Sequence, residues 1–481
     1  MASFSFGAGN ASKLRRIPLY LAGRLVTTLV PRSRDEWVFG CAVGVADGAL
    51  ALHTVAATHD ERTTWLVADA DQARDAERLG IRWVRRDSAA GFWRTARARV
   101  IVVTHGFGDV QRYATTGAVI VQLWHGIPLK RIGLDSAETT RSPVLPRVLS
   151  PVLRMLYRRT TRRISLLPAA SHLVRGRLES AFSLTDERVP VTGEPRVDVL
   201  SSGDAASRRA TARDGLESAL GMPLNDRRVV LYAPTWRDGE PDPAIPDAGE
   251  WERIAAALDA ADAVLLVRSH PLGAGDYHPP HGTDRVAALG SDLAADVTPL
   301  LPGLDALITD YSSLAFDASL VPLPVVFFAP DLEAYAARRG LYGRYADVAG
   351  TDPARSWEDA LAQLGAVLAE PAAALAASRD RSARVHAHRD GRNAERVYAA
   401  VRSRLERRGP RRREESRSLR QAQGPRRGQG PRWGQGPRRG QGPRWGQGPR
   451  WDQGPRWGQG PRRGDAPPPA PDDLSQKDER P

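Results

Sequence analysis

Residues 306–321 read ALITDYSSLAFDASLV and join a short apolar run directly to a helical stretch. Ala306–Thr309 predicts a buried strand, and Ser313–Val321 predicts the helix that follows it. The same alternation recurs along the chain. Further strands are predicted at Trp37–Val43, Thr64–Val67, Val100–Thr104, Ala118–Leu123, Val229–Ala233, Ala263–Arg268 and Pro324–Ala329. Further helices are predicted at Ala49–Ala57, Asp71–Leu79, Trp251–Ala260, Trp357–Leu368 and, as one long charged helix, Ala373–Glu406. Strands separated by helices indicate parallel sheets, so we expect an α/β protein with two doubly wound, Rossmann-like domains.

The alternation divides the chain into four predicted regions. They are an N-terminal amphipathic and basic segment (1–34), a first Rossmann-like domain (35–188), a second one (189–406) and a tail (407–481). Ligands of such sheets bind at the carboxyl ends of the strands, so we expect the site in a central cleft where the two domains face each other.

The charge of the chain is concentrated in its tail. The 481 residues carry a formal net charge of +13, and residues 407–481 hold 19 basic and 8 acidic residues, which leaves +2 for the rest. In the tail, Gln-Gly-Pro-Arg recurs seven times at a six-residue period. Proline and glycine in every unit predict disorder. Spaced arginine and tryptophan also fit contact with nucleic acid or another polyanion, and a repeat without a selected role fits equally.

Cysteine content and hydropathy exclude several classes of protein. The single cysteine, Cys41, rules out an intramolecular disulfide framework, a cysteine-rich zinc site and an iron–sulfur cluster. It fits a reducing compartment. No run of about 18 apolar residues predicts a membrane-spanning helix.

Two basic helical segments raise the question of a membrane surface. Ile17–Val30 predicts an amphipathic helix that either packs on the first domain or rests on an anionic membrane. Residues 144–183 also look helical and basic. In the membrane alternative, the arginines that face lipid headgroups are Arg15, Arg16, Arg24 and Arg32.

Four polar clusters follow predicted strands. The first, QLWHGIPLK (122–130), presents His125 as a candidate general base, with Lys130 and Arg131 as nearby positive charges. The second, YAPTWR (232–237), offers the hydroxyl of Thr235 and the guanidinium of Arg237 to a phosphate.

The third and fourth clusters also suit phosphate. In VRSHP (267–271), Arg268 and His270 point the same way along an extended segment and suit a pyrophosphate. In TDYSSLAFD (309–317), Ser312 is a candidate N-cap beside Ser313, and Asp317 is a candidate acceptor for a ribose or substrate hydroxyl. Taken singly, each cluster also fits an ordinary turn or helix cap. Together they indicate a phosphate-rich donor pocket, whereas the fingerprints of dinucleotide-binding and P-loop proteins are absent from the sequence.

These clusters, in this order, resemble the CDP-glycerol glycerophosphotransferase family, the teichoic acid primases and polymerases. The resemblance is carried by QLWHGIPLKRIG (122–133), GEPRVDVL (193–200), YAPTWR, RSHP and TDYSSLAFD, and it continues in Pro324–Phe328 and Arg339–Tyr342. It implies a GT-B fold and transfer of a polyol phosphate, most simply glycerol phosphate, from a CDP-activated donor to a hydroxyl, with release of CMP. It also implies a peripheral enzyme on the cytoplasmic face of the membrane.

The resemblance assigns roles to residues of this chain. His125 resembles the general base on the acceptor hydroxyl, and His270 resembles a second essential histidine on the donor phosphates. The positions that resemble donor-contacting ones are Leu129, Lys130, Arg131, Ile132, Gly133, Arg196, Pro234, Thr235, Arg237, Arg268, Ser269, Ser312, Ser313 and Asp317. The implied partners are CDP-glycerol or CDP-ribitol, a lipid-linked glycerol-phosphate or saccharide acceptor, and an anionic membrane surface. No specific nucleic acid is implied. The sequence requires no metal, and a divalent cation stays unassigned.

The sequence departs from the family pattern at three positions and leaves alternatives open. Ile127 stands where the family usually has Thr, Val197 where it has Asn, and Ser269 where it has Pro. These changes question the identity of the donor or acceptor more than the reaction class. The alternatives are a GT-B glycosyltransferase that uses a nucleotide-sugar and a protein that binds polyanions through its tail. Glycerol or ribitol, single addition or polymerisation, and the oligomeric state stay open.

Overall fold

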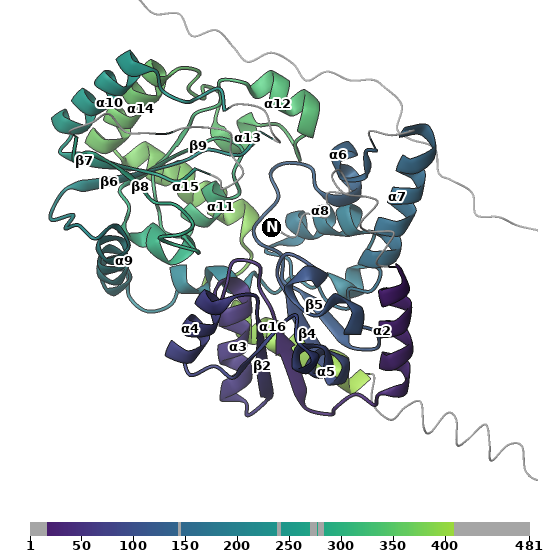
Figure 1. The fold of residues 1–481 in the computed structure, drawn as a ribbon. Helices are drawn as coiled ribbons and strands as arrows, with labels where there is room; N and C mark the ends of the chain where they lie inside the picture. The colour runs from purple at the N-terminus through teal and green to yellow at the C-terminus, as the bar shows by residue number, and fades with distance from the viewer. Residues whose placement is uncertain (1–16, 143–145, 238–241, 270–276, 278–282, 408–481) are drawn as a thin grey trace, which may run out of the picture. The chain divides into compact units, whose positions relative to one another are not determined.

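The computed structural model describes residues 17–142, 146–237, 242–269, 277 and 283–407. Figure 1 shows the arrangement of the helices and strands. The repeats of the tail, the arginines Arg15 and Arg16, and His270 lie outside the described residues.

The first sheet has five parallel strands in the order β3-β2-β1-β4-β5. Its strands are β1 (Glu36–Phe39), β2 (Arg62–Val67), β3 (Trp83–Arg85), β4 (Val100–Val103) and β5 (Val119–Gln122). The connecting helices are α3 (Asp47–Thr58), α4 (Ala70–Arg78) and α5 (Ala89–Arg97). All residues of β1, β4 and β5 are buried, as expected for strands covered on both faces.

The second sheet repeats this design in the order β10-β9-β6-β7-β8, again with parallel pairing throughout. Its strands are β6 (Arg228–Ala233), β7 (Ala263–Val267), β8 (Val286–Ala288), β9 (Ala306–Thr309) and β10 (Val325–Phe327). Its helices are α9 (Ala205–Leu220), α10 (Ala248–Ala260), α11 (Leu314–Ala318), α12 (Leu332–Arg339), α13 (Ala346–Ala349), α14 (Trp357–Ala369) and α15 (Ala372–Val385). Two parallel sheets with helices confirm the predicted α/β class.

Four further helices and a final one complete the described fold. They are α2 (Ile17–Leu29), α6 (Ala137–Thr140), α7 (Pro146–Thr161), α8 (His172–Phe182) and, at the end, α16 (Asn393–Arg407). Short 3₁₀ turns lie between them, among them η2 (Arg112–Ala114) and η5 (Pro195–Leu200).

The structure corrects several predicted elements. The single long helix Ala373–Glu406 is two helices, α15 and α16, because the chain leaves helical geometry between Val385 and Asn393. The helix predicted at Ser313–Val321 is the five-residue α11. The strands β3 and β8 were not predicted, since each has only three residues and neither is buried along its length.

The last helix packs on the first sheet, although it follows the second sheet in sequence. Val397, Val401 and Leu405 of α16 lie in one buried cluster with residues of β1 and α3. The carboxylate of Asp198 accepts hydrogen bonds from the backbone N–H groups of Asn393 and Ala394, at 2.9 and 2.7 Å, and so caps the start of α16. The domain boundaries at residues 35, 189 and 407 stay predictions.

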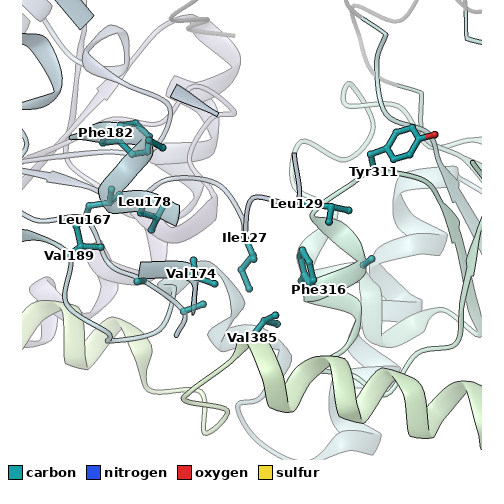
Figure 2. Close-up of a cluster of buried hydrophobic side chains, with 14 of the residues drawn as sticks. Ile127, Leu129, Leu167, Val174, Leu178, Phe182, Val189, Tyr311, Phe316 and Val385 are labelled. Carbon is teal, nitrogen blue, oxygen red and sulfur yellow. The ribbon is translucent and has the colours of Figure 1, made fainter. Parts of the chain in front are cut away.

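A second buried cluster joins the loop after β5 to the second sheet (Figure 2). Ile127 and Leu129 of that loop pack in one cluster with Phe316 of α11 and Val385 at the end of α15. Backbone hydrogen bonds continue this contact, because Arg131 N–H donates to the Gly340 carbonyl at 2.9 Å. The loop that carries His125 is therefore held by residues from both halves of the fold.

Within the described ranges, no single helix combines the length and apolar composition needed to cross a membrane. Helices α14 and α15 have the required length and apolar composition only when they are taken together, and the chain bends by 96° at the break between them.

Candidate active site

The backbone around His125 is strained in a way that fixes the loop. β5 ends at Gln122, whose Nε2 donates to the Thr104 carbonyl at 2.8 Å and ties the strand end to β4. Trp124 adopts φ +64° and Gly126 φ +129°, on either side of the histidine. A non-glycine residue in the left-handed region costs on the order of 1–3 kcal/mol, and such residues cluster at functional sites. The turn thus presents His125 in one orientation at the carboxyl end of β5.

His125 is enclosed by aromatic rings. Its ring stacks on His105, with the two centroids 4.3 Å apart and the planes 2° from parallel, and it also contacts Trp124. Its Nδ1 is buried and has no hydrogen-bond partner among the described residues. Burial holds the pKa of His125 well below its ordinary value, and the nearby His105 and Arg196 lower it further. A neutral imidazole with an unused ring nitrogen suits a general base.

Sequence analysis missed His105, which follows β4 directly. The loop that carries it is closed by Asp109, whose Oδ2 accepts from the backbone N–H groups of Thr104 and His105 at 2.9 and 2.8 Å. Burial lowers the pKa of His105, against the effect of Asp109. The signal that could have found His105 is the one that found His125, a histidine placed at the end of a buried apolar run.

Arg196 joins the two halves of the site by ion pairs. Its Nη1 donates to Asp317 Oδ1 at 2.7 Å, its Nη2 donates to Thr298 Oγ1 at 3.1 Å, and its Nε lies 3.4 Å from Asp47 Oδ1. Asp47 opens α3 beside the first sheet, and Asp317 belongs to α11 beside the second. Although burial disfavours the charge of Arg196, Asp317 and Asp47 raise its pKa. The neighbouring Glu194 is also buried, which raises its pKa to about 8.

This network changes the prediction for Asp317. The carboxylate is 1% exposed, and one of its oxygens is taken by Arg196. Its Oδ2 has no partner in the part of the chain that the structure describes. Asp317 thus serves first to hold Arg196.

Ser313 lies against Gly126 of the His125 loop, and Ser312 precedes it in the sequence. Ser312 Oγ accepts from the Leu314 backbone N–H at 3.2 Å, but the N-cap of α11 is Ser313, whose side chain makes no capping hydrogen bond, so the prediction of Ser312 as the N-cap is corrected. A Cβ added to Gly126 would lie 2.7 Å from Ser313 Oγ. Glycine is therefore required here both by its positive φ and by the approach of the serine. The loop with the candidate base therefore lies close to Ser313, at the start of α11.

Arg237 does not hold the position that the sequence suggested. Its guanidinium is buried, with Nε and Nη2 donating to Asp331 at 2.8 and 3.0 Å and Nη1 donating to Asp310 at 2.7 Å. The rings of Tyr311 and Tyr335 each lie 5.1 Å from it. The prediction of a phosphate grip is corrected, since these contacts occupy the guanidinium and fasten the YAPTWR loop to the strand end at Asp310.

The other residues of YAPTWR (232–237) and VRSHP (267–271) use only some of their polar atoms in hydrogen bonds. Thr235 N–H donates to Asp310 at 2.9 Å, whereas its Oγ1 is buried without a partner among the described residues, and Pro234 before it is half-buried. Arg268 is half-buried and donates to backbone carbonyls of residues 289, 290 and 295 at 3.1–3.3 Å. Ser269 beside it is half-buried. The role of His270 stays a prediction, because that residue lies outside the described ranges.

The segment Leu129–Gly133 runs beside residues 340–342. Leu129 is 1% exposed and packs in the cluster of Figure 2, and Ile132 packs partly against it. The backbone of Lys130 pairs with that of Leu341 in an isolated antiparallel β-bridge. Gly133 adopts φ +55° against the Ala181 carbonyl. The predicted donor contacts of Leu129 and Gly133 are thus not side-chain contacts. The side chain of Lys130 is half-buried and that of Arg131 is exposed, so both have surface that a donor could reach.

Comparison with known proteins identifies the family. The model of the family described as CDP-glycerol:poly(glycerophosphate) glycerophosphotransferase matches residues 28–403. The chain belongs to this family. The resemblance seen in the sequence is thereby confirmed, and the chain is assigned to a family of transferases.

Individual relatives agree with this assignment. The teichoic acid glycerol-phosphate transferase of Staphylococcus aureus is 32% identical over 244 residues, which are 48% of this chain and 58% of that protein. The teichoic acid poly(glycerol phosphate) polymerase of Staphylococcus epidermidis is 32% identical over 235 residues, 47% of this chain and 30% of that one. The matched part thus spans less than two thirds of either curated relative.

The fold agrees with a solved structure. The wall teichoic acid polymerase TagF superposes with a TM-score of 0.65 at 22% identity, over 83% of this chain and 97% of that one. The predicted GT-B-like architecture is confirmed.

Proposed function

We propose that this chain transfers glycerol phosphate from CDP-glycerol to a hydroxyl group of a lipid-linked or polymeric acceptor, in the synthesis of a teichoic-acid-like polymer. The observation that carries this proposal is the His125 loop. The imidazole of His125 is kept neutral by burial and has a buried Nδ1 without a partner among the described residues, and the next residue, Gly126, lies against Ser313 at the start of α11. A proton acceptor next to a cluster suited to phosphate is what this reaction needs.

In the proposed reaction, the acceptor oxygen attacks the β-phosphorus of the donor. A new O–P bond forms, the bond from that phosphorus to the bridging oxygen breaks, and its electron pair leaves with CMP. The proton of the acceptor hydroxyl passes to His125. The negative charge of the phosphates is stabilised by Ser312, Ser313, Arg268 and His270. Arg196 holds α3 and α11 in a fixed relative position through its ion pairs with Asp47 and Asp317. The task of the protein is then positioning and charge stabilisation.

The test is release of CMP. CDP-glycerol and CDP-ribitol are each incubated with a lipid-linked glycerol-phosphate acceptor and either wild type or His125→Ala. We expect CMP from CDP-glycerol and a loss of about 10²- to 10⁴-fold in the variant. His53→Gln is the matched control, because His53 is another buried histidine of the first half and lies apart from the site. Its rate should stay near that of wild type.

Two results would contradict the proposal. One is a His125→Ala variant that is folded and as active as wild type. The other is the absence of CMP from both donors, with nucleoside diphosphate released from a nucleotide-sugar instead, which would favour the glycosyltransferase alternative.

We further propose that the chain acts at the cytoplasmic face of an anionic membrane as a peripheral protein. Helix α2 packs on η2, where Gly23 lies against the Tyr113 carbonyl, and Thr27 on the same face is buried, so its other face is open. Leu21, Leu25 and Leu29 on α2 are 65%, 63% and 75% exposed. Exposed leucines beside arginines suit the headgroup region of a bilayer.

Helix α7 adds a second apolar and basic surface. Val148 and Met155 are 63% and 60% exposed, and Arg158 and Arg159 lie in its last turn. Arg163, just after α7, is close enough to α2 to interact electrostatically with Tyr20 and Arg24. Arg32 is not part of this surface, because its guanidinium donates to carbonyls of Thr95, Ala98, Ala114 and Thr116.

Sedimentation with vesicles tests this surface. We expect wild type to bind phosphatidylglycerol vesicles and Leu21→Glu/Leu25→Glu to lose binding while its circular dichroism is unchanged. Leu79→Glu is the matched control, since Leu79 is 49% exposed at the end of α4. Equal binding by the wild type and by the double variant would refute the assignment of α2.

A further inference from the structure

Three metal-ligating side chains of different chemistry meet beside the first sheet. Cys41 lies two residues after β1, Asp47 is the first residue of α3, and His105 follows β4. One ligand atom from each lies within 4.8 Å of the other two. The strand order β3-β2-β1-β4-β5 reverses between β1 and β4, and ligands of doubly wound sheets bind at that point.

The local structure holds these side chains in place. Thr104 Oγ1 lies 3.2 Å from Cys41 Sγ and 2.9 Å from His105 Nδ1, so one hydroxyl fixes two of the three. Asp47 adopts φ +61°, and its Oδ1 accepts from the Gly48 N–H at 2.6 Å. A strained backbone at the aspartate persists only where the surroundings impose it, which points to a function for the carboxylate position.

Charge supplies an independent argument. Arg196 pairs with two carboxylates, Asp317 at 2.7 Å and Asp47 at 3.4 Å, so one positive charge is shared between two negative ones. Asp109 is 2% exposed, acts electrostatically on Cys41, and has an Oδ1 without a partner among the described residues. Buried carboxylates are costly unless they are paired or coordinate a metal. A further cation next to Cys41 and Asp47 would offset this excess.

We propose that Cys41, Asp47 and His105 bind one divalent transition-metal ion of the zinc class. Thiolate, imidazole and carboxylate are together the ligands of zinc and its neighbours, whereas magnesium prefers six oxygen atoms. Metal–ligand bonds of about 2.0–2.3 Å place the ligands of a tetrahedral ion roughly 3.3–3.8 Å apart. The present separations close to these values by side-chain movements of about 1 Å. Three protein ligands leave the fourth position for water or a substrate oxygen.

Cobalt titration tests the site in the full chain. After removal of metals with a chelator, Co²⁺ should bind at one ion per chain and give a sulfur-to-cobalt charge-transfer band. Because Cys41 is the only cysteine of the chain, this band reports Cys41 alone. We expect Zn²⁺ to displace the band, Cys41→Ser to abolish it, and His105→Asn and Asp47→Asn to weaken binding at least about tenfold. His172→Ala, which removes an exposed histidine at the start of α8, should leave it unchanged.

A second measurement needs no variant. X-ray absorption of the zinc-loaded wild type should show one sulfur at about 2.3 Å with nitrogen and oxygen at about 2.0–2.2 Å. The proposal is overturned by a shell without sulfur, by the absence of a band at millimolar Co²⁺, or by a band of wild-type affinity in both His105→Asn and Asp47→Asn. CMP release is not part of these readouts, so failure of the metal site and failure of the proposed transferase activity stay distinguishable.

Discussion

Replacement of Arg237 distinguishes a structural role from a phosphate contact. Arg237→Met keeps the length of the side chain but removes three charged hydrogen bonds to Asp310 and Asp331. Breaking a buried ion pair by removal of one partner costs about 3–5 kcal/mol, because the other charge stays buried. Loss of the contacts with Tyr311 and Tyr335 adds about 0.5–1 kcal/mol each. We therefore expect the free energy of unfolding to fall by about 4 kcal/mol or more.

Urea unfolding, followed by tryptophan fluorescence, measures this loss. Arg355→Met is the matched control. Arg355 also holds a carboxylate with two nitrogens, Glu333 at 2.9 and 3.1 Å, but it is 41% exposed and Glu333 is 79% exposed. Exposed pairs contribute about 0–1 kcal/mol, so the same substitution should be nearly neutral there. The two sites then differ in burial, in the additional hydrogen bond of Arg237 to Asp310 and in its two tyrosine contacts.

Affinity for the donor completes the experiment. At a temperature where Arg237→Met is folded, its affinity for CDP-glycerol should fall less than that of Arg268→Ala, which removes a guanidinium bound only weakly to backbone carbonyls. The reasoning is refuted if Arg237→Met unfolds within about 1 kcal/mol of wild type and loses donor affinity about tenfold. That result would return Arg237 to the phosphate contact expected from the sequence.

Three further predictions concern the loop, the core and the last helix. Gly126→Ala should lower CMP release far more than Gly117→Ala, because both glycines have positive φ but only the first Cβ would strike Ser313; equal losses would contradict this. Burial lowers the pKa of His53 to about 4 in the folded protein. His53 therefore contributes up to about 3 kcal/mol to the free energy of unfolding above pH 6.5, and this contribution is lost as the pH falls through 4. His53→Leu should flatten this acid dependence in thermal melts, and an unchanged slope would refute it. Asp198→Ala should destabilise the protein by about 1–2 kcal/mol through loss of the α16 cap, as measured by urea unfolding; an unchanged midpoint would argue against that cap.

The positions of the site residues along the chain could be predicted, but their contacts could not. Buried apolar runs such as Val100–Val103 identify strands, and polar residues just after a strand end share one edge of a parallel sheet, so His125 and Ser312 were found. Arg196 and Asp317 were named without their mutual ion pair, and Asp47 was not named. Such pairs join segments far apart in sequence, and local pattern carries no information about them.

Helix periodicity has the same limit. The spacing of Val397, Val401 and Leu405 predicts an apolar helix face, yet it does not say which surface covers that face. Sequence order placed this helix with the second sheet, whereas its packing partners belong to the first.

Two of the three departures from the family pattern, Ile127 and Val197, lie in the buried core. Ile127 is fully buried between α8 and α11, and Val197 is 1% exposed in the cluster with Leu216 and Leu231. Neither side chain reaches a surface that a donor could touch, so each replaces a buried polar group by an apolar one that packs without needing a hydrogen bond. Differences in donor choice should then arise from groups with unused polar atoms, such as the Thr235 hydroxyl, and not from these two positions. These two departures are consequently changes of packing, and they do not argue against the proposed CDP-glycerol donor.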